Sequence, residues 1–372
     1  MATRTKQILD SCKPFRERSE TIVLATIIET LGSSYQKAGA RMLITASGEL
    51  YGLLGGGCVE GDLKEKAGTV FRDGQAKLVF YDMRAPAYAI WGLGLGCNGA
   101  VRILLQRLSG ADDYRPLSLI ENVTSQRKTG VLVTVYESTD PVWQPGKCFM
   151  LDCEQSDTAI AQNSPAFFYE AARMALLADK PLARTHQYDG HELKAFYDII
   201  KPPSHLLIIG AGTDAVPVVQ LAKGLGWRIT IVDYRPAWTT TERFPCADQL
   251  LHCYPEELAG SVALDQVHAM VLMTHNIEYD ERYLKVIAAG NIPYVGLLGP
   301  AARRDRLLDS LAEMAGRIQG RVFGPAGLDI GAETPEEIAL AIMAEIQAVM
   351  HRRDGGQLYN NPRPLHDRET PE

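Results

Sequence analysis

The stretch HLLIIGAGTDAVPVVQLAKGLGWRITIVDYRP, residues 205–236, decides the fold of the C-terminal half of this chain. Its branched apolar run, Leu206–Ile209, predicts a strand that is buried on both faces. Small residues follow, which permit a tight turn, and then a segment typical of a helix ends at Gly224. A second apolar strand, Ile229–Val232, ends at Asp233. The stretch therefore predicts a strand–helix–strand unit with a glycine turn over a helix N-terminus, a place where phosphate groups bind.

The turn matches the GxGxxA form of the dinucleotide-binding fingerprint. Gly210 and Gly212 supply its glycines, and Asp233 lies at the downstream position whose carboxylate accepts a hydrogen bond from a ribose hydroxyl. Asp214 falls inside the turn, where its charge would repel a phosphate. The alternative is that Asp214 caps the helix. The pattern thus predicts a Rossmann-like fold and leaves the ligand open, with NAD(P) or another nucleotide as candidates.

Further strands and helices alternate after residue 236, which indicates a doubly wound parallel sheet. In such sheets ligands lie beyond the carboxyl ends of the strands. His275 follows a buried strand and is the acid/base candidate of this half, although a histidine there could also simply pack. Four strand ends are expected to converge: Gly210–Asp214, Asp233–Arg235, Thr274–His275 and Gly296–Gly299.

Glycine-rich loops with one cysteine each mark the N-terminal half, which we expect to be an α+β domain. In the first, Gly55, Gly56 and Gly57 precede Cys58, and apolar residues then recur at helical spacing. Cys58 would thus lie at a helix N-terminus, where free N–H groups and the helix dipole stabilise a thiolate. Glu60 and Asp62 nearby would oppose that ionisation, and a structural cysteine in a tight loop is the alternative.

The second loop, GLGLGCNG at residues 92–99, places Cys97 among alternating glycines that cannot stabilise a helix. Two such loops in one domain indicate a shared site, so we expect both to face one cleft that the Rossmann-like domain closes. The predicted cofactor-binding residues of these loops are Gly55, Gly56, Gly57, Cys58, Glu60, Gly96, Cys97 and Asn98.

Composition sets the class of protein. The chain has 372 residues, of which 46% are hydrophobic and 22% charged, as in ordinary globular proteins. The net charge of −7 argues against nucleic acid or an acidic membrane as partner. Seven cysteines, none in a CxxC pair, and an N-terminus without an apolar core predict a cytoplasmic protein with no membrane segment.

Four regions are expected along the chain. They are an N-terminal domain (1–108), a β-rich middle segment and linker (109–200), the Rossmann-like domain (201–350) and a loose C-terminal tail (351–372). Within the middle segment, strands are expected over residues 115–155, and residues 164–201 are expected to be helix, turn and linker.

These motifs together resemble the xanthine dehydrogenase accessory factor family of the XdhC/CoxI type. The matching stretches are GGGCVEGD (55–62), GLGLGCNG (92–99), GAGTDA (210–215), VDYRP (232–236), MTHN (273–276), YVGLLG (294–299) and PAGLDIGAETPEEIALAIMAEI (325–346). The resemblance implies a chaperone that binds molybdopterin, the molybdenum cofactor. It would hold the cofactor while a partner cysteine desulfurase exchanges the terminal oxo ligand for sulfur, and deliver it to a xanthine dehydrogenase-like molybdenum hydroxylase.

Site residues and assembly follow as expectations from this resemblance. Cys58 and Cys97 belong to its functional N-terminal region, and thiolate is a plausible ligand or neighbour for molybdenum, so both are our metal-ligand candidates. We also expect a homodimer. Two alternatives remain: an NAD(P)-dependent oxidoreductase that uses the Rossmann turn, Asp233 and His275, and a scaffolding partner of a hydroxylase that binds no small molecule.

Overall fold

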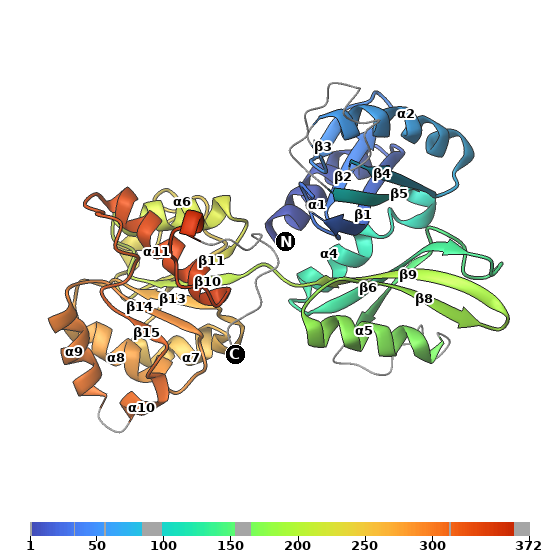
Figure 1. The fold of residues 1–372 in the computed structure, drawn as a ribbon. Coiled ribbons are helices and arrows are strands. Elements are labelled where there is room, and N and C mark those ends of the chain that lie inside the picture. The colour runs from blue at the N-terminus through green and yellow to red at the C-terminus, as the bar shows by residue number, and fades with distance from the viewer. Residues whose placement is uncertain are drawn as a thin grey trace. The chain divides into compact units, whose positions relative to one another are not determined.

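A computed structural model describes residues 2–32, 34–55, 57–83, 99–152, 165–311 and 314–360 (Figure 1). The chain divides into two compact units after Pro202. The first unit is built on antiparallel sheets and the second on a parallel sheet, so the predicted α/β class with an α+β first half is confirmed. Within the described ranges, no helix combines the length and the apolar character that a membrane span requires.

The first sheet of unit 1 has the strand order β3-β2-β1-β5-β4, and all its neighbours pair antiparallel. Its long central strands are buried because helices cover both faces: α2 packs on one face and α1 on the other. The elements are α1 (Ala2–Glu17), β1 (Ile22–Gly32), β2 (Arg41–Thr45), β3 (Leu50–Gly52), α2 (Cys58–Asp73), β4 (Lys77–Asp82) and β5 (Gly99–Leu108).

The second sheet of unit 1 has the order β7-β6-β9-β8, and it contains two strands in the predicted β-rich segment, β6 and β7, and two that were not predicted, β8 and β9. Residues 182–200, expected as turn and linker, form a β-hairpin whose second strand is buried along most of its length. Tyr197 faces α5, whereas Phe196 packs with Ile28 and Leu104 of the first sheet. The elements are α4 (Leu117–Ser125), β6 (Gly130–Ser138), β7 (Cys148–Asp152), α5 (Ala166–Ala178), β8 (Leu182–Tyr188) and β9 (His191–Ile200).

Unit 2 is the expected doubly wound sheet. Its strand order is β12-β11-β10-β13-β14-β15, and every pair is parallel. The order runs outward in both directions from β10, so the topological switch lies between β10 and β13. The strands are β10 (His205–Ile209), β11 (Arg228–Asp233), β12 (Gln249–His252), β13 (Ala269–Leu272), β14 (Tyr294–Leu297) and β15 (Val322–Phe323).

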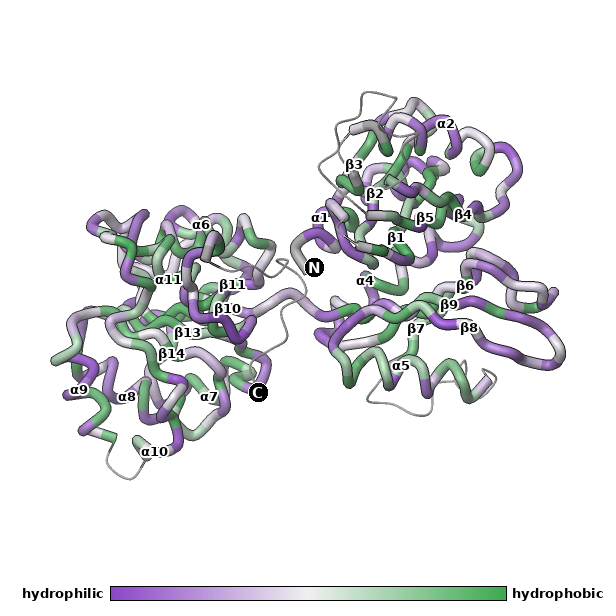
Figure 2. Tube along the Cα trace, in the orientation of Figure 1, coloured by the Kyte–Doolittle hydropathy of each residue, from purple (hydrophilic) through white to green (hydrophobic). Residues whose placement is uncertain are grey.

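Helices cover both faces of this sheet, which explains the unbroken apolar runs of its strands. In Figure 1, α6 and α11 lie on one face and α7, α8, α9 and α10 on the other. Ile208 accordingly packs toward α6, and its neighbour Ile209 toward α8. Figure 2 shows the hydrophobic residues concentrated along the central strands. The helices are α6 (Ala215–Gly224), α7 (Leu258–Ser261), α8 (Ile277–Ala288), α9 (Ala301–Ser310), α10 (Ala315–Ile318) and α11 (Pro335–Met350).

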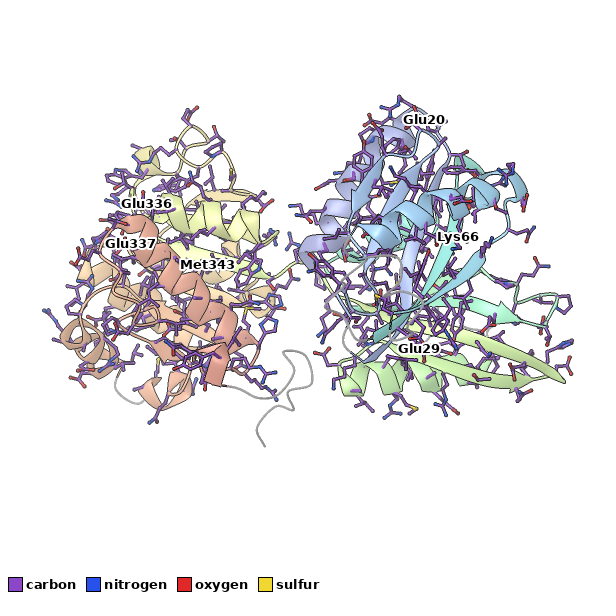
Figure 3. The ribbon with its side chains drawn as sticks, turned by 45° about the horizontal axis from the view of Figure 1, so that its top comes forward. Glu20, Glu29, Lys66, Glu336, Glu337 and Met343 are labelled. Carbon is purple, nitrogen blue, oxygen red and sulfur yellow. The ribbon has the colours of Figure 1, made fainter. Side chains whose placement is uncertain are left out.

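The last long helix, α11, starts at a capping box. The Thr334 hydroxyl accepts a hydrogen bond from the Glu337 backbone N–H, and the Glu337 carboxylate accepts one from the Thr334 N–H. Figure 3 labels Glu336 and Glu337 near the start of this helix and Met343 farther along it. Met343 is buried against the sheet, so the cap fixes where the buried face of α11 begins.

Candidate functional site

The turn after β10 requires glycine at its first position. Gly210 has φ +117°, and a Cβ atom there would lie 2.3 Å from the Met273 carbonyl oxygen at the end of β13. A Cβ on Gly212 would lie 2.3 Å from Oδ1 of Asp214. Gly210 therefore lets the turn lie directly against the end of the neighbouring strand, as predicted for a tight turn with close backbone approach, and Gly212 leaves room for the Asp214 side chain.

Asp214 and His275 meet at the topological switch. Asp214 stands at the N-cap position of α6, but its side chain makes no capping hydrogen bond. Its Oδ2 instead lies 2.7 Å from Nε2 of His275. The interpretation of Asp214 as a helix cap is therefore wrong. With the proton on Nε2, His275 donates to Asp214 and leaves Nδ1 as a proton acceptor on a side chain that is 61% exposed.

The turn that carries His275 is held by a buried polar network. His275 itself has φ +60°, a left-handed conformation that is uncommon for a residue with a side chain. The adjacent Thr274 hydroxyl donates to Oδ1 of Asp280 at 2.5 Å, and Arg303 Nη2 donates to Oδ2 of the same carboxylate at 2.6 Å. Sequence patterns missed Asp280 and Arg303, because their ion pair joins two helices, α8 and α9, and forms only when these pack together.

Asp233 is directed into the protein. Its side chain is fully buried, and its two oxygens accept hydrogen bonds from the Ala211 N–H, the Arg235 N–H and the Arg235 guanidinium at 2.7–2.9 Å. Burial favours the neutral acid, but these hydrogen bonds outweigh it and hold the pKa of Asp233 below its ordinary value of 3.8. The carboxylate predicted to bind a ribose hydroxyl thus has both oxygens engaged by the chain itself.

The first glycine loop of unit 1 is organised by Glu60. Its Oε1 accepts from the backbone N–H groups of Leu54 (3.1 Å) and Gly55 (2.6 Å), and its Oε2 accepts from the N–H of Gly57 (2.7 Å). Glu60 is only 5% exposed. The helix α2 begins at Cys58, which confirms the predicted helix start directly after the glycines.

Both carboxylates near the start of α2 have their charge compensated. Glu60 is satisfied by the three loop N–H groups, and Asp62 accepts hydrogen bonds from Lys66, a residue labelled in Figure 3, and from the Tyr81 hydroxyl. Burial would raise the pKa of Asp62, but these hydrogen bonds keep it below its usual value. The expected opposition of these carboxylates to a thiolate at this helix start is therefore weakened.

A face without side chains lies at the first turn of α2. Gly57 has φ +92°, and no heavy atom of the described residues lies within 4 Å of the position that a Cβ would occupy on Gly57 or on Gly61. The Gly61 N–H donates to the Gly57 carbonyl oxygen at 3.2 Å, so the two glycines lie one helical turn apart. Within the part of the chain that the structure describes, the start of α2 therefore leaves its backbone open to another molecule at these two glycines, on either side of Cys58 in sequence.

Several predicted residues lie outside the part of the chain that the structure describes. These are Gly56, the side chain of Cys58, and Gly96, Cys97 and Asn98, so their roles remain predictions. Among the described residues, no group of three His, Cys, Asp or Glu side chains could hold a metal ion. Burial raises the pKa of Cys12 to about 11 and that of Cys148 to about 12, so these thiols stay protonated at neutral pH.

Replacing Glu60 with glutamine is expected to loosen the glycine loop. A glutamine oxygen can still accept from Leu54 and Gly55, but its NH₂ group would then face the Gly57 N–H, donor against donor. An unsatisfied buried donor costs about 2 kcal/mol. Hydrogen exchange measured by mass spectrometry should show faster exchange over residues 54–60, whereas the exposed control Glu65→Gln should leave it unchanged. Equal exchange in Glu60→Gln and wild type would contradict the assigned role of Glu60.

Comparisons with known proteins agree with the motifs. Residues 206–346 match the family model described as the XdhC Rossmann domain, and residues 15–82 match that of the XdhC and CoxI family. A Bacillus subtilis (strain 168) protein, whose name describes it as a probable xanthine dehydrogenase subunit, is 32% identical over 338 residues. These residues cover 89% of this chain and 93% of that protein.

Two further relatives extend the comparison. The Escherichia coli (strain K12) protein YqeB is 30% identical over 215 residues, which cover 57% of this chain and 38% of YqeB. A crystal structure of a xanthine dehydrogenase from Bacillus halodurans is similar with a TM-score of 0.70 at 25% identity, over 94% of this chain and 98% of that one. The resemblance found in the motifs is thereby confirmed: this chain belongs to the XdhC and CoxI family.

Proposed function

We propose that this chain is an accessory protein of a xanthine dehydrogenase-type molybdenum hydroxylase. It binds molybdopterin cofactor as its cargo, holds it while a partner cysteine desulfurase exchanges the terminal oxo ligand for sulfur, and delivers it to the hydroxylase. The observation that carries the proposal is the start of α2. There the open face at Gly57 and Gly61 lies beside Cys58, on a loop that Glu60 holds in place.

The chemistry of the cargo fits this place. Molybdopterin carries a phosphate group, and the N-terminus of a helix with side-chain-free backbone favours phosphate. Molybdenum accepts soft thiolate ligands, which a cysteine at a helix N-terminus supplies most readily. The hydrogen bonds that compensate the negative charges of Glu60 and Asp62 support the same conclusion. An unpaired carboxylate there would repel both phosphate and thiolate.

The partner is proposed from the relatives. Proteins similar to this chain over nearly all of its length carry xanthine dehydrogenase in their names, which favours a hydroxylase of that type. We further propose that the protein works as a homodimer in the cytoplasm, where thiols stay reduced. Light scattering of the purified protein tests the dimer: twice the chain mass of 40.9 kDa is expected, and the mass of one chain would contradict it.

Co-expression tests the accessory role. The xanthine dehydrogenase-type hydroxylase of the same genome would be produced with and without this chain, purified, and assayed for activity and for cyanide-releasable sulfur at its molybdenum centre. The proposal predicts that hydroxylase made without the chain lacks most of its activity and of this sulfur. Full activity in both preparations would contradict it.

Replacing Cys58 or Cys97 with alanine is expected to lower the amount of pterin that co-purifies with the protein. A lost metal–thiolate or thiolate–ligand interaction reduces affinity by about tenfold or more. Cys246→Ala is the matched control, because Cys246 is a free, partly buried thiol in unit 2. If both Cys58→Ala and Cys97→Ala retained pterin like wild type, the two cysteines would have no part in binding.

A second candidate function rests on the Asp214–His275 pair. A histidine oriented by a carboxylate at a topological switch is the arrangement that an oxidoreductase of the NAD(P)-dependent type could use for proton transfer. This function would be established if the protein turned over NAD(P)H with a small-molecule substrate and if His275→Gln abolished that turnover. NAD(P)H binding without turnover would leave the accessory function as the better account.

A further inference from the structure

A cluster of two arginines and one tryptophan adjoins the glycine turn of unit 2. Trp238 ends a short 3₁₀ turn (Pro236–Trp238) that follows β11. The Arg235 guanidinium carbon lies 3.9 Å from the centre of the Trp238 ring, and that of Arg243 lies 4.6 Å from it. Arg243 also donates from Nη2 to the Ala211 carbonyl oxygen at 3.1 Å. The cluster is therefore fixed to the turn that the fingerprint predicts for phosphate.

The charge of Arg243 has no counterpart in this cluster. Arg235 is paired with Asp233, but among the described residues no carboxylate forms an ion pair with Arg243. The Nε–H of Arg243 is buried and has no acceptor there either. A buried donor without an acceptor is destabilising, and in folded proteins such groups commonly mark an absent ion, water or ligand. An anion beside the exposed part of the Arg243 guanidinium would balance its charge.

The engagement of Asp233 restricts which anion suits the site. In dinucleotide-binding folds, a free carboxylate at the end of the second strand binds the ribose diol, whereas an arginine nearby accommodates a ribose 2′-phosphate. Here Asp233 is fully buried with both oxygens occupied, so it offers nothing to a diol. Guanidinium groups, by contrast, match phosphate with paired N–H donors.

We propose that Arg243, with Arg235 and Trp238, binds the phosphate of a 2′-phosphorylated adenosine, so that unit 2 takes NADP-type dinucleotides in preference to NAD-type ones. This inference concerns the Rossmann unit and does not depend on the pterin site of unit 1. Asp214 sits in the same turn, but its carboxylate is directed to His275 and not to Arg243.

Calorimetric titration of the full-length protein tests the proposal with two matched probe pairs: NADPH against NADH, and adenosine 2′-monophosphate against adenosine 5′-monophosphate. The first pair differs only by the 2′-phosphate, and the second pair differs only in whether the single phosphate is at the 2′ or the 5′ position. We expect the 2′-phosphorylated member of each pair to bind about tenfold tighter or more, the difference that a charge-assisted phosphate contact supplies. Equal binding within both pairs, or no binding of any probe, would overturn the proposal.

Variants locate the contact. Arg243→Met keeps an unbranched apolar stem and removes the guanidinium charge, and it should weaken the binding of NADPH by about tenfold while leaving the binding of NADH unchanged. Arg243→Lys is included in case Arg243→Met does not fold. It keeps the charge but loses the paired donors, so its affinity for NADPH should lie between those of Arg243→Met and wild type. Lys285→Met removes the same unit of charge from an exposed pair with Glu281 and should have no effect. Unchanged NADPH affinity in a folded Arg243→Met would refute the assignment, whatever the pterin content of the protein.

Discussion

Replacing Gly210 with alanine is expected to destabilise unit 2 by about 4 kcal/mol, among the largest effects of a single substitution. The added Cβ would lie 2.3 Å from the Met273 carbonyl oxygen, 2.5 Å from its carbon and 2.8 Å from the Thr274 nitrogen. All three are backbone atoms, so no side-chain rotation relieves the clash. The φ of +117° adds conformational strain for any residue with a side chain.

Gly224→Ala is the matched control for this substitution. Gly224 ends α6 and is not in the left-handed region, and none of the described residues has a heavy atom within 4 Å of its Cβ position. Alanine there should be neutral or stabilise the helix by up to about 1 kcal/mol. Differential scanning calorimetry of both full-length variants measures the contrast. If Gly210→Ala unfolded at the same temperature as wild type, the turn could not lie against the end of β13.

Replacing Asp198 with leucine is expected to destabilise unit 1 by about 3–5 kcal/mol. Asp198 of β9 pairs with Arg41 of β2 at 2.6 Å, and the side chains are only 2% and 5% exposed. The pair connects the two sheets of this unit. Removal of the carboxylate leaves the Arg41 guanidinium buried without a counter-charge, which is more costly than the loss of the bond itself.

A double-mutant cycle separates the cost of leaving a buried charge unpaired from the cost of lost packing. Arg41→Met should also destabilise the unit, but Arg41→Met/Asp198→Leu should recover most of the stability, because it removes both buried charges. Arg102→Met, which breaks the half-exposed pair with Glu29, is the control and should change stability by less than about 1 kcal/mol. Strictly additive losses in the double variant would show that the buried pair is not coupled.

Local patterns predicted much of this structure. The apolar run, glycine turn and second strand at residues 205–233 are present as β10, α6 and β11, and the four strand ends lie at one edge because the sheet is parallel. The start of α2 at Cys58 was equally visible, since glycine runs cannot continue a helix and apolar spacing follows. These features depend on residues that are neighbours in the sequence, and so they could be predicted from the sequence alone.

Features that depend on distant partners were missed. The β8–β9 hairpin was not predicted, because β9 is buried on both faces and lacks the alternation of apolar and polar residues that marks a half-exposed strand. The strand ends that carry Asp214 and His275 were expected to converge, but the sequence does not show that the Asp214 side chain turns to His275 and not to the helix N-terminus. Arg243 was not considered at all, since its contact with Ala211 arises only when the chain folds.

The most direct test of the accessory function is the cofactor content of the protein itself. The chain would be produced in a host that makes molybdopterin, purified without oxygen and denatured, and the extract oxidised and measured for pterin fluorescence and for molybdenum. The account predicts pterin and molybdenum in near-equal amounts, approaching one per chain. Protein that contains neither, after preparation from a host with ample cofactor, would contradict it.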